Sequence, residues 1–459
     1  MTIAGDLARF VTQTRDEDIP QRVIDYSAML VASTVASAAA GSRLDSSSII
    51  RSLMLARGGA AESTVWFSDG QRLPMACAAR VNALMSDSAA SDDSDLRNAV
   101  HAGTSAVAAA IAVAEKTGAS GKEVLRAIAL GCEVACRINT GVVPGLTYEN
   151  GFHGCTVAIY GAVTSAGVLL KLDAMQMTHA LALAATSIGG LLAAANTSTA
   201  RDHHAGLAAM LGVEAAQLAG MGFTAEESLF EHPAGFFAVY GLDSQASGRM
   251  AQVVDKLGQE WQTLTHMAIK LVPGGHPHHA IAEAAAQAAR MADVPASEIN
   301  AIICSKPGMK KMPGPRHPEN LIDMAHSPIY FAAAGAADGG LTWAHATPEK
   351  ILDPRIRSLL DLVQAGEPPT ENVERYQQGA TVTVKTRDGR SFTSTVFAPR
   401  GSAINGIEWT DIDDKLRALC PSAGVSPASI ESCIRIVRDF RELRHVQSLV
   451  ALLDVPALA

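Results

Sequence analysis

The chain has 459 residues and a formal net charge of −9, from 46 acidic and 37 basic side chains. Nucleic-acid-binding proteins need a basic face, so this balance excludes nucleic acid as the main partner. Hydrophobic residues make up 48% and charged residues 18%, which indicates a globular protein with a large core. The length exceeds that of one ordinary domain, and we expect two.

The N-terminal stretch MTIAGDLARFVTQTRDED has no basic segment followed by a continuous apolar run, so no signal peptide is predicted. The most apolar window, 180–195, is too short for a membrane span and contains two glycines, which favours a buried helix. The seven cysteines are scattered without a CxxC pair, as expected for reduced thiols. We therefore expect a cytoplasmic protein with no membrane partner.

Residues 2–260 have a helical pattern almost throughout. Apolar residues recur at three- and four-residue spacings in 23–40, 47–56 and 122–138, and Ser120 with Glu123 predicts a capping box for the third segment. Other segments are rich in small residues, which let helices approach closely and predict the centre of a bundle. These segments are 106–114, 157–170, 180–195 and 205–219.

The pattern changes near residue 265. A helix is expected at 280–292 and a strand at 298–305, followed by helices at 327–337 and 348–362. Thr347 and Pro348 suit the N-cap and first position of the last of these helices. Two alternating segments, 380–386 and 391–397, flank Asp388-Gly389 and predict a hairpin with a type I′ turn.

Helical patterns resume after Gly401, at 411–419, 429–440 and 446–453. The predicted fold is therefore mainly α. A large helical-bundle domain comes from both chain ends, residues 1–265 and 401–459, and residues 266–400 form an inserted, smaller α+β lid domain.

Histidines mark the candidate chemistry, because nucleotide-binding glycine loops, a GxSxG elbow and HExxH are absent from the sequence. Seven of the 14 histidines lie in four short clusters at expected helix–loop junctions, where side chains can converge on a cleft. The clusters are His101, His153, the pair His203-His204, and the trio His276, His278 and His279.

Two of these clusters carry a cation. Arg201 lies three residues before His204, and Lys270 precedes a Pro-Gly-Gly loop and the histidine trio. Cations, imidazoles and helix N–H groups together suit a substrate that bears carboxylates, and histidine can exchange protons near neutral pH.

The same residues could also have purely structural roles. Each histidine could be structural, and the HPHH tract could bind a metal, although no acidic or cysteine ligand is near it in sequence. Arg201 and Asp202 could form a surface ion pair, and the acidic run at 92–95 could be an exposed loop.

The order of motifs resembles the MmgE/PrpD family over nearly the whole chain. That resemblance implies a helical domain from both chain ends with an α+β lid, a homodimer, and no metal or organic cofactor. It rests on Gly151-Phe152-His153, on Arg201 with His204-Ala205-Gly206, on Lys270 with His279, and on Tyr330 after Ala325 and Ser327.

The chain departs from the family in its acidic motif. The family has Asp-Phe-Asp-Asp-Thr followed by His-Pro, where this chain has Ala90 to Ser94 and His101-Ala102. The first acid of the motif is thus missing at Ala90, and either Asp92 or Asp93 could substitute for it. Arg201 replaces a lysine, which keeps the charge and removes proton transfer, so we expect a carboxylate clamp.

The resemblance implies a cofactor-independent lyase that moves a proton next to a carboxylate of a small di- or tricarboxylic acid, like the members acting on 2-methylcitrate or cis-aconitate. The alternatives are an isomerase or epimerase of a related acid, a non-catalytic carboxylate-binding protein, and a histidine-ligated metal hydrolase. The expected catalytic residues are His101, His153, His279, Tyr330 and Asp93, and the expected substrate-binding residues are Arg201, His204, Lys270 and Ser94.

Overall fold

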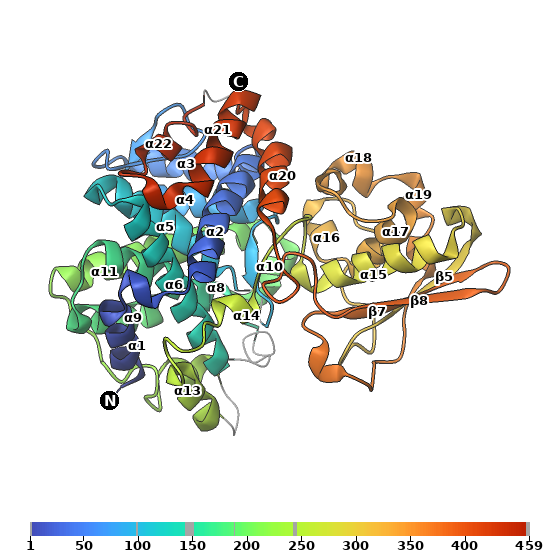
Figure 1. The fold of residues 1–459 in the computed structure, drawn as a ribbon, viewed down its shortest axis with the longest axis horizontal. Helices are drawn as coiled ribbons and strands as arrows, with labels where there is room; N and C mark the ends of the chain where they lie inside the picture. Colours follow the sequence, from blue (N-terminus) through green and yellow to red (C-terminus); the bar gives the residue numbers. More distant parts are fainter. Residues whose placement is uncertain (1, 98–99, 143–150, 188, 242–245, 456–459) are drawn as a thin grey trace. The chain divides into compact units, whose positions relative to one another are not determined.

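The computed structural model describes residues 2–97, 100–142, 151–187, 189–241 and 246–455. The chain forms two compact units (Figure 1). Unit 1 comprises Met1–Ile269 and Glu408–Ala459, and unit 2 comprises Lys270–Ile407. The predicted mainly α class is confirmed. Unit 2 begins and ends a few residues after the boundaries of 266 and 400 that the sequence pattern suggested.

Unit 1 is a bundle of helices from both chain ends. The C-terminal α20 packs beside α2 (Figure 1), so the last segment of the chain helps to enclose the N-terminal helices. The helices of unit 1 are α1 (Ile3–Gln13), α2 (Gln21–Gly41), α3 (Asp45–Arg57), α4 (Met75–Ser88), α5 (Ala102–Thr117), α6 (Gly121–Val142), α8 (Cys155–Leu169), α9 (Ala174–Ser187), α10 (Leu192–Thr197), α11 (Ala200–Gly220), α12 (Phe236–Tyr240), α13 (Ala246–Val254), α14 (Thr263–His266), α20 (Trp409–Leu419), α21 (Pro427–Arg438) and α22 (Gln447–Val450).

Small residues hold the central helices together, as predicted for α5, α8 and α11. A side chain at Gly161 of α8 would lie 2.8 Å from the carbonyl oxygen of Ala102 in α5, and one at Gly212 of α11 would lie 2.6 Å from Ala162. The predicted capping box also forms at α6, where the Ser120 amide donates to Glu123 at 2.8 Å. Close backbone approach therefore fixes the scaffold that carries the candidate site.

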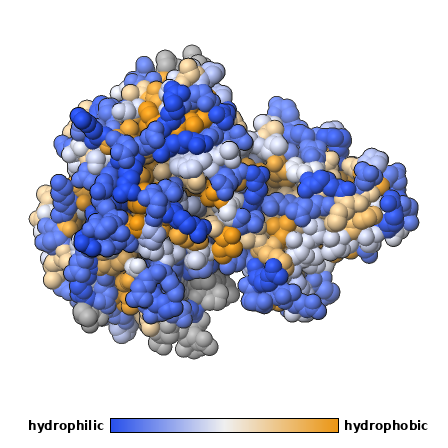
Figure 2. All heavy atoms as spheres, in the orientation of Figure 1, coloured by the Kyte–Doolittle hydropathy of each residue, from blue (hydrophilic) through white to orange (hydrophobic). Residues whose placement is uncertain are grey.

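Helix α2 is long and apolar enough to cross a membrane by length and composition alone, and 89% of its apolar window is buried inside the structure. Figure 2 shows a mostly hydrophilic visible face with hydrophobic residues between the polar ones. The apolar character of α2 therefore matches its place in the core of the bundle.

Two short antiparallel ladders complete unit 1. The first joins β1 (Ser63–Thr64) to β2 (Arg72–Leu73), and the second joins β3 (Asp93–Asp95) to β4 (Met267–Ile269). Asp92, Asp93, Ser94 and Asp95 are all at most 1% exposed. The acidic run is thus not an exposed loop, and its carboxylates require partners inside the protein.

The helix expected at 180–195 is wrong as a single element. Helix α9 ends at Ser187 and α10 begins at Leu192, with residue 188 outside the described residues. Between them, the Gly190 carbonyl accepts a hydrogen bond from the His153 amide at 2.9 Å, and Leu191 bridges to Phe152. A side chain at Gly190 would lie 2.6 Å from Cys155 Sγ, so only glycine fits here without displacement.

Unit 2 contains a four-stranded sheet in the order β6-β5-β7-β8, parallel between β5 and β6 and antiparallel elsewhere. Its strands are β5 (Ile299–Ser305), β6 (Val363–Ala365), β7 (Ala380–Thr386) and β8 (Ser391–Val396). Helix α15 (His276–Ala292) packs against the sheet and against α17 (Pro328–Asp338), while α16 (Leu321–Ala325) is a short element before α17.

Two local predictions in unit 2 are wrong. The hairpin turn is not type I′, because only Gly389 of the Asp388-Gly389 pair has a positive φ, at 89°. The Asp388 carboxylate accepts hydrogen bonds from Thr386 Oγ1 and the Arg390 amide and so stabilises a wider loop. The helix expected at 348–362 breaks into α18 (Pro348–Ile351), α19 (Pro354–Arg357) and a 3₁₀ turn at Leu360–Leu362, because Pro354 cannot donate a helical hydrogen bond.

The contact around Gly190 gives a first prediction. We expect Gly190→Ala to lower the free energy of unfolding by about 1–3 kcal/mol, because its Cβ overlaps the Cys155 sulfur. Gly189→Ala is the matched control, because a Cβ there meets nothing within 4 Å. Chemical denaturation of both variants followed by circular dichroism measures the difference. Equal stability of the two variants would contradict the steric explanation.

Candidate functional site

Three of the four histidine clusters converge in unit 1. His101 is the N-cap residue of α5, His153 precedes α8, and His204 is the fifth residue of α11. The ring centroids of His101 and His153 are 6.3 Å apart, and those of His153 and His204 are 4.9 Å apart. His203 points elsewhere, with Nδ1 3.3 Å from a guanidinium nitrogen of Arg80. Residues far apart in sequence therefore form one imidazole cluster.

His101 is oriented by acceptors on one side of its ring. Its Nδ1 lies 2.7 Å from Asp92 Oδ2 and 2.7 Å from the Asp93 carbonyl oxygen. Both atoms are acceptors, so the proton of the neutral ring resides on Nδ1 and the lone pair on Nε2. Nε2 lies 3.8 Å from Asp87 Oδ1. His101 can therefore exchange a proton through Nε2 while Asp92 stabilises the charged ring.

Asp93, expected to be catalytic, has a structural position. Its two carboxylate oxygens accept hydrogen bonds from the Gly103 and Thr104 amides at 2.8 Å each, which caps the first turn of α5. Burial raises the pKa of Asp93, and the neighbouring Asp92 raises it further. Ser94 lies beside it in β3 and is 1% exposed.

His153 and His204 occupy the other side of the cluster. The Cys155 amide, at the start of α8, donates to His153 Nδ1 at 3.4 Å, which places the proton of the neutral ring on Nε2. His204 is 6% exposed, and its Nδ1 has no hydrogen-bond partner among the described residues. Burial and the neighbouring His203 lower the pKa of His204, so this imidazole is neutral near pH 7.

Arg201 is engaged within the protein. Its Nη2 donates at 3.0 Å to the carbonyl oxygens of Asp87 and Ser88, at the end of α4, and to Asp202 Oδ1. Its Nε lies 3.7 Å from Asp87 Oδ2. Although burial acts to lower the pKa of Arg201, the carboxylates of Asp87 and Asp202 raise it. The expected clamp for a substrate carboxylate thus already holds two carboxylates of the chain.

Asp87 is a site residue that sequence analysis missed. It lies in the last turn of α4, is 2% exposed, and is close to both His101 and Arg201. Burial raises the pKa of Asp87 to about 6, while Arg201 and His101 act to lower it. The helical pattern of α4 gives no sign of this role, because the partners come from α5 and α11.

Two groups in unit 1 could hold a metal ion by distance alone: His153 with Cys155 and His204, and Asp87 with Asp92 and His101. The first fits poorly, because burial raises the pKa of the Cys155 thiol to about 12 and the thiolate is the ligand form. The second fits poorly, because the Arg201 guanidinium already lies beside Asp87. The histidine trio forms no such group among the described residues. The imidazoles and carboxylates of the cluster are chemically suited to acid–base reactions.

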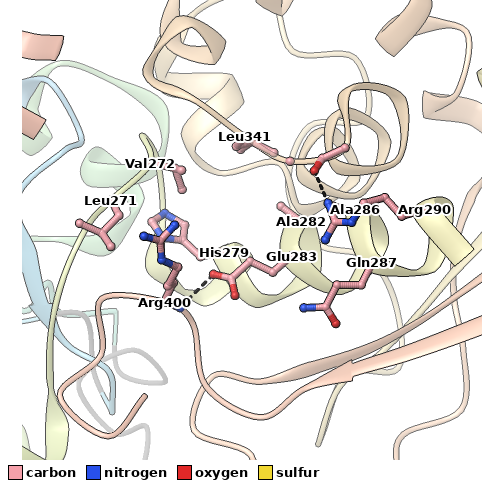
Figure 3. A pocket seen from close by; sticks show the side chains of 12 residues that line it. Leu271, Val272, His279, Ala282, Glu283, Ala286, Gln287, Arg290, Leu341 and Arg400 are labelled. Atoms are coloured by element: carbon pink, nitrogen blue, oxygen red, sulfur yellow. Dashed lines mark hydrogen bonds between the residues drawn. The ribbon is translucent and has the colours of Figure 1, made fainter. Parts of the chain in front are cut away.

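The remaining sequence candidates lie in unit 2. His279 is 1% exposed and stacks on Phe331 with centroids 5.7 Å apart. It lines a cavity of about 380 Å³ with Glu283 and Arg400 (Figure 3). The Glu283 carboxylate accepts a hydrogen bond from the Arg400 amide at 2.9 Å, and burial raises the pKa of Glu283. The cavity runs along α15 from His279 to Arg290 and is lined by side chains of both charges.

Tyr330 and Lys270 are also buried, at 0% and 4% exposure. The Tyr330 hydroxyl donates to the Lys350 carbonyl oxygen at 3.0 Å, and burial raises the pKa of Tyr330 above its usual value. Tyr330 therefore lies within the core of unit 2. Lys270 directly follows Ile269, which pairs with Asp93 in the β3–β4 ladder.

Metal content is a direct check on the acid–base assignment. We expect elemental analysis of the purified protein to find no stoichiometric zinc, because burial disfavours the Cys155 thiolate that zinc would need and Arg201 occupies the acidic group. One zinc per chain that disappears in Cys155→Ser, but not in Cys77→Ser, would contradict the assignment.

Comparison with known proteins gives a consistent identification. Residues 5–248 match the MmgE/PrpD N-terminal domain, and residues 273–439 match the MmgE/PrpD C-terminal domain. Human cis-aconitate decarboxylase is 29% identical over 407 residues, which cover 86% of this chain and 82% of the human protein. The mouse cis-aconitate decarboxylase is 27% identical over 408 residues, with the same two coverages. The Aspergillus terreus cis-aconitate decarboxylase is 27% identical over 281 residues, or 59% of this chain and 56% of that protein. The chain belongs to the MmgE/PrpD family.

Proposed function

We propose that this protein is a cofactor-independent lyase that acts on a small di- or tricarboxylic acid by proton transfer next to a carboxylate. Decarboxylation of cis-aconitate or a close analogue is the first candidate reaction, because the cis-aconitate decarboxylases match most of the chain. The observation that carries the proposal is the placement of His101, with Asp92 at Nδ1, Asp87 nearest to Nε2, and the His153 ring 6.3 Å away between centroids.

In the proposed reaction, the bond between the substrate and one carboxylate breaks, and carbon dioxide leaves. The electron pair stays on carbon, delocalised toward the neighbouring unsaturated acid. Protonated His101 then gives its Nε2 proton to carbon, which forms the new C–H bond, and the neutral ring regains a proton from water. A positioned imidazole of this kind contributes a rate factor of about 10²–10⁴.

Other residues are proposed to bind and orient the substrate. His153 would hydrogen-bond the substrate through Nε2, because its Nδ1 accepts from the Cys155 amide. Lys270 is our proposed cation for a substrate carboxylate, and His204 and Ser94 are proposed to orient the acid. For Arg201, which already holds two carboxylates, we propose that positioning Asp87 is the main contribution. The catalytic roles of His279 and Tyr330 are proposed from the family resemblance alone.

The alternatives differ from this reaction in what happens to the proton and to the carboxylate. An isomerase or epimerase would exchange the proton without breaking the bond to the carboxylate, and the missing acid at Ala90 favours it. A non-catalytic family member would bind the acid without exchange. We further propose a cytoplasmic homodimer, which follows from the family resemblance and the reduced cysteines.

Proton NMR in D2O tests the proposal. The protein is incubated with cis-aconitate, 2-methylcitrate, citrate, malate and iminodisuccinate in turn. We expect cis-aconitate signals to decline while a product alkene with one deuterium appears. His101→Ala should slow this at least about 100-fold, because it removes the proton donor. His203→Ala is the matched control, because that ring lies beside Arg80 and does not contact His101.

The other outcomes identify the alternatives. Deuterium exchange without loss of a carboxylate would indicate an isomerase or epimerase, and a new alkene from 2-methylcitrate would indicate a dehydratase. Binding of an acid in calorimetry with no exchange for any compound would contradict the enzyme assignment.

A further inference from the structure

The buried acids near His101 make different contacts. Asp93 uses both carboxylate oxygens to cap α5, and Asp92 engages Nδ1 of His101. Ala90, where the family motif has its first acid, carries no carboxyl group. Among the described residues, the carboxylate that faces the other ring nitrogen of His101 is Asp87, from α4.

The environment of Asp87 differs from that of a structural carboxylate. Its Oδ1 lies 3.8 Å from His101 Nε2, and its Oδ2 lies 3.7 Å from Arg201 Nε. Oδ2 is buried and has no hydrogen-bond partner among the described residues. Burying a carboxylate oxygen without a hydrogen bond is costly, and Arg201 offsets that cost only through an ion pair at 3.7 Å.

We infer that Asp87 is a positioning residue that controls the proton on Nε2 of His101, and that it supplies from α4 the acid that this chain lacks at Ala90. Any effect of Asp87 on catalysis rests on the proposed function, whereas the electrostatic coupling between Asp87 and His101 does not. The protonated ring of His101 then lies between two carboxylates, with Asp92 at Nδ1 and Asp87 facing Nε2. This arrangement stabilises the ring as a proton donor.

The expected pH dependence follows from the charges around Asp87. Burial raises the pKa of Asp87 to about 6, so above that pH the carboxylate is charged and favours the protonated ring. As pH falls below about 6, Asp87 gains a proton and this support is lost. The groups whose charges act on Asp87 are Arg201, His101, Asp92 and Asp202, and Asp87 in turn acts on Cys155.

The test uses NMR of the full chain with labelled histidine rings, assigned with His101→Gln. In Asp87→Asn, the pH at which His101 loses its proton should fall by about one unit or more, because a neighbouring negative charge is removed. Asp202→Asn is the matched control. Asp202 also pairs with Arg201 in the buried core, at 3.0 Å, but Ser46 and not His101 is its other contact.

An unchanged His101 titration in Asp87→Asn, or an equal shift in Asp202→Asn, would overturn the inference. The wild-type protein gives an independent readout if Asp87→Asn does not fold. Its His101 signals should show a second inflection near pH 6, where Asp87 titrates, and a single inflection would count against the coupling.

Activity separates this inference from the proposed function. If the wild-type protein turns over an acid, the upper pH limit of the rate should move down in Asp87→Asn by the same amount as the ring titration, and Asp87→Glu should restore much of it. If no acid is turned over but the ring titration shifts as expected, the proposed function fails and the coupling stands.

Discussion

The site depends on burying several charges in one place without leaving any unbalanced. Asp87, Asp92, Asp93 and Asp202 lie in the core of unit 1 with the Arg201 guanidinium, the His101 ring and the start of α5. An isolated carboxylate would be very costly there, so each one has a cation, an imidazole or helix N–H groups within reach. Within this arrangement, the carboxylates of Asp87 and Asp92 are the negative charges that lie beside the His101 ring.

The scaffold brings these groups together by close helix packing. Glycines and alanines in α5, α8 and α11 let backbones touch, and the N-termini of these three helices carry the three histidines. The C-terminal part of the chain contributes directly. Lys415 of α20 donates to the Ser91 carbonyl oxygen, which also accepts from Ser37 Oγ at 2.9 Å. The two chain ends thus fix the backbone immediately before Asp92.

The chain differs from the family motifs at Ala90 and at Arg201. Ala90 carries no carboxyl group, and the carboxylate of Asp87 in the preceding helix lies 3.8 Å from His101 Nε2. Arginine at position 201 suits such a site, because its planar guanidinium bonds two helix carbonyls and a carboxylate at once. A single lysine ammonium at this position has fewer donors for the same set.

Local sequence patterns predicted the helical class, most helix positions and the capping box at Ser120, and they singled out His101, His153 and His204 as candidates. These follow from periodicity, small-residue content and motif order, which are local signals. Which partner each buried acid contacts depends on how the helices pack in three dimensions. Asp93 caps α5, and Asp87 lies beside His101. Gly190 lies between two helices where one was predicted, and Pro354 lies at a second such break. These contacts join α4, α5, α8 and α11. Contacts between side chains of different helices produce no periodic pattern in the sequence, so they cannot be predicted from it.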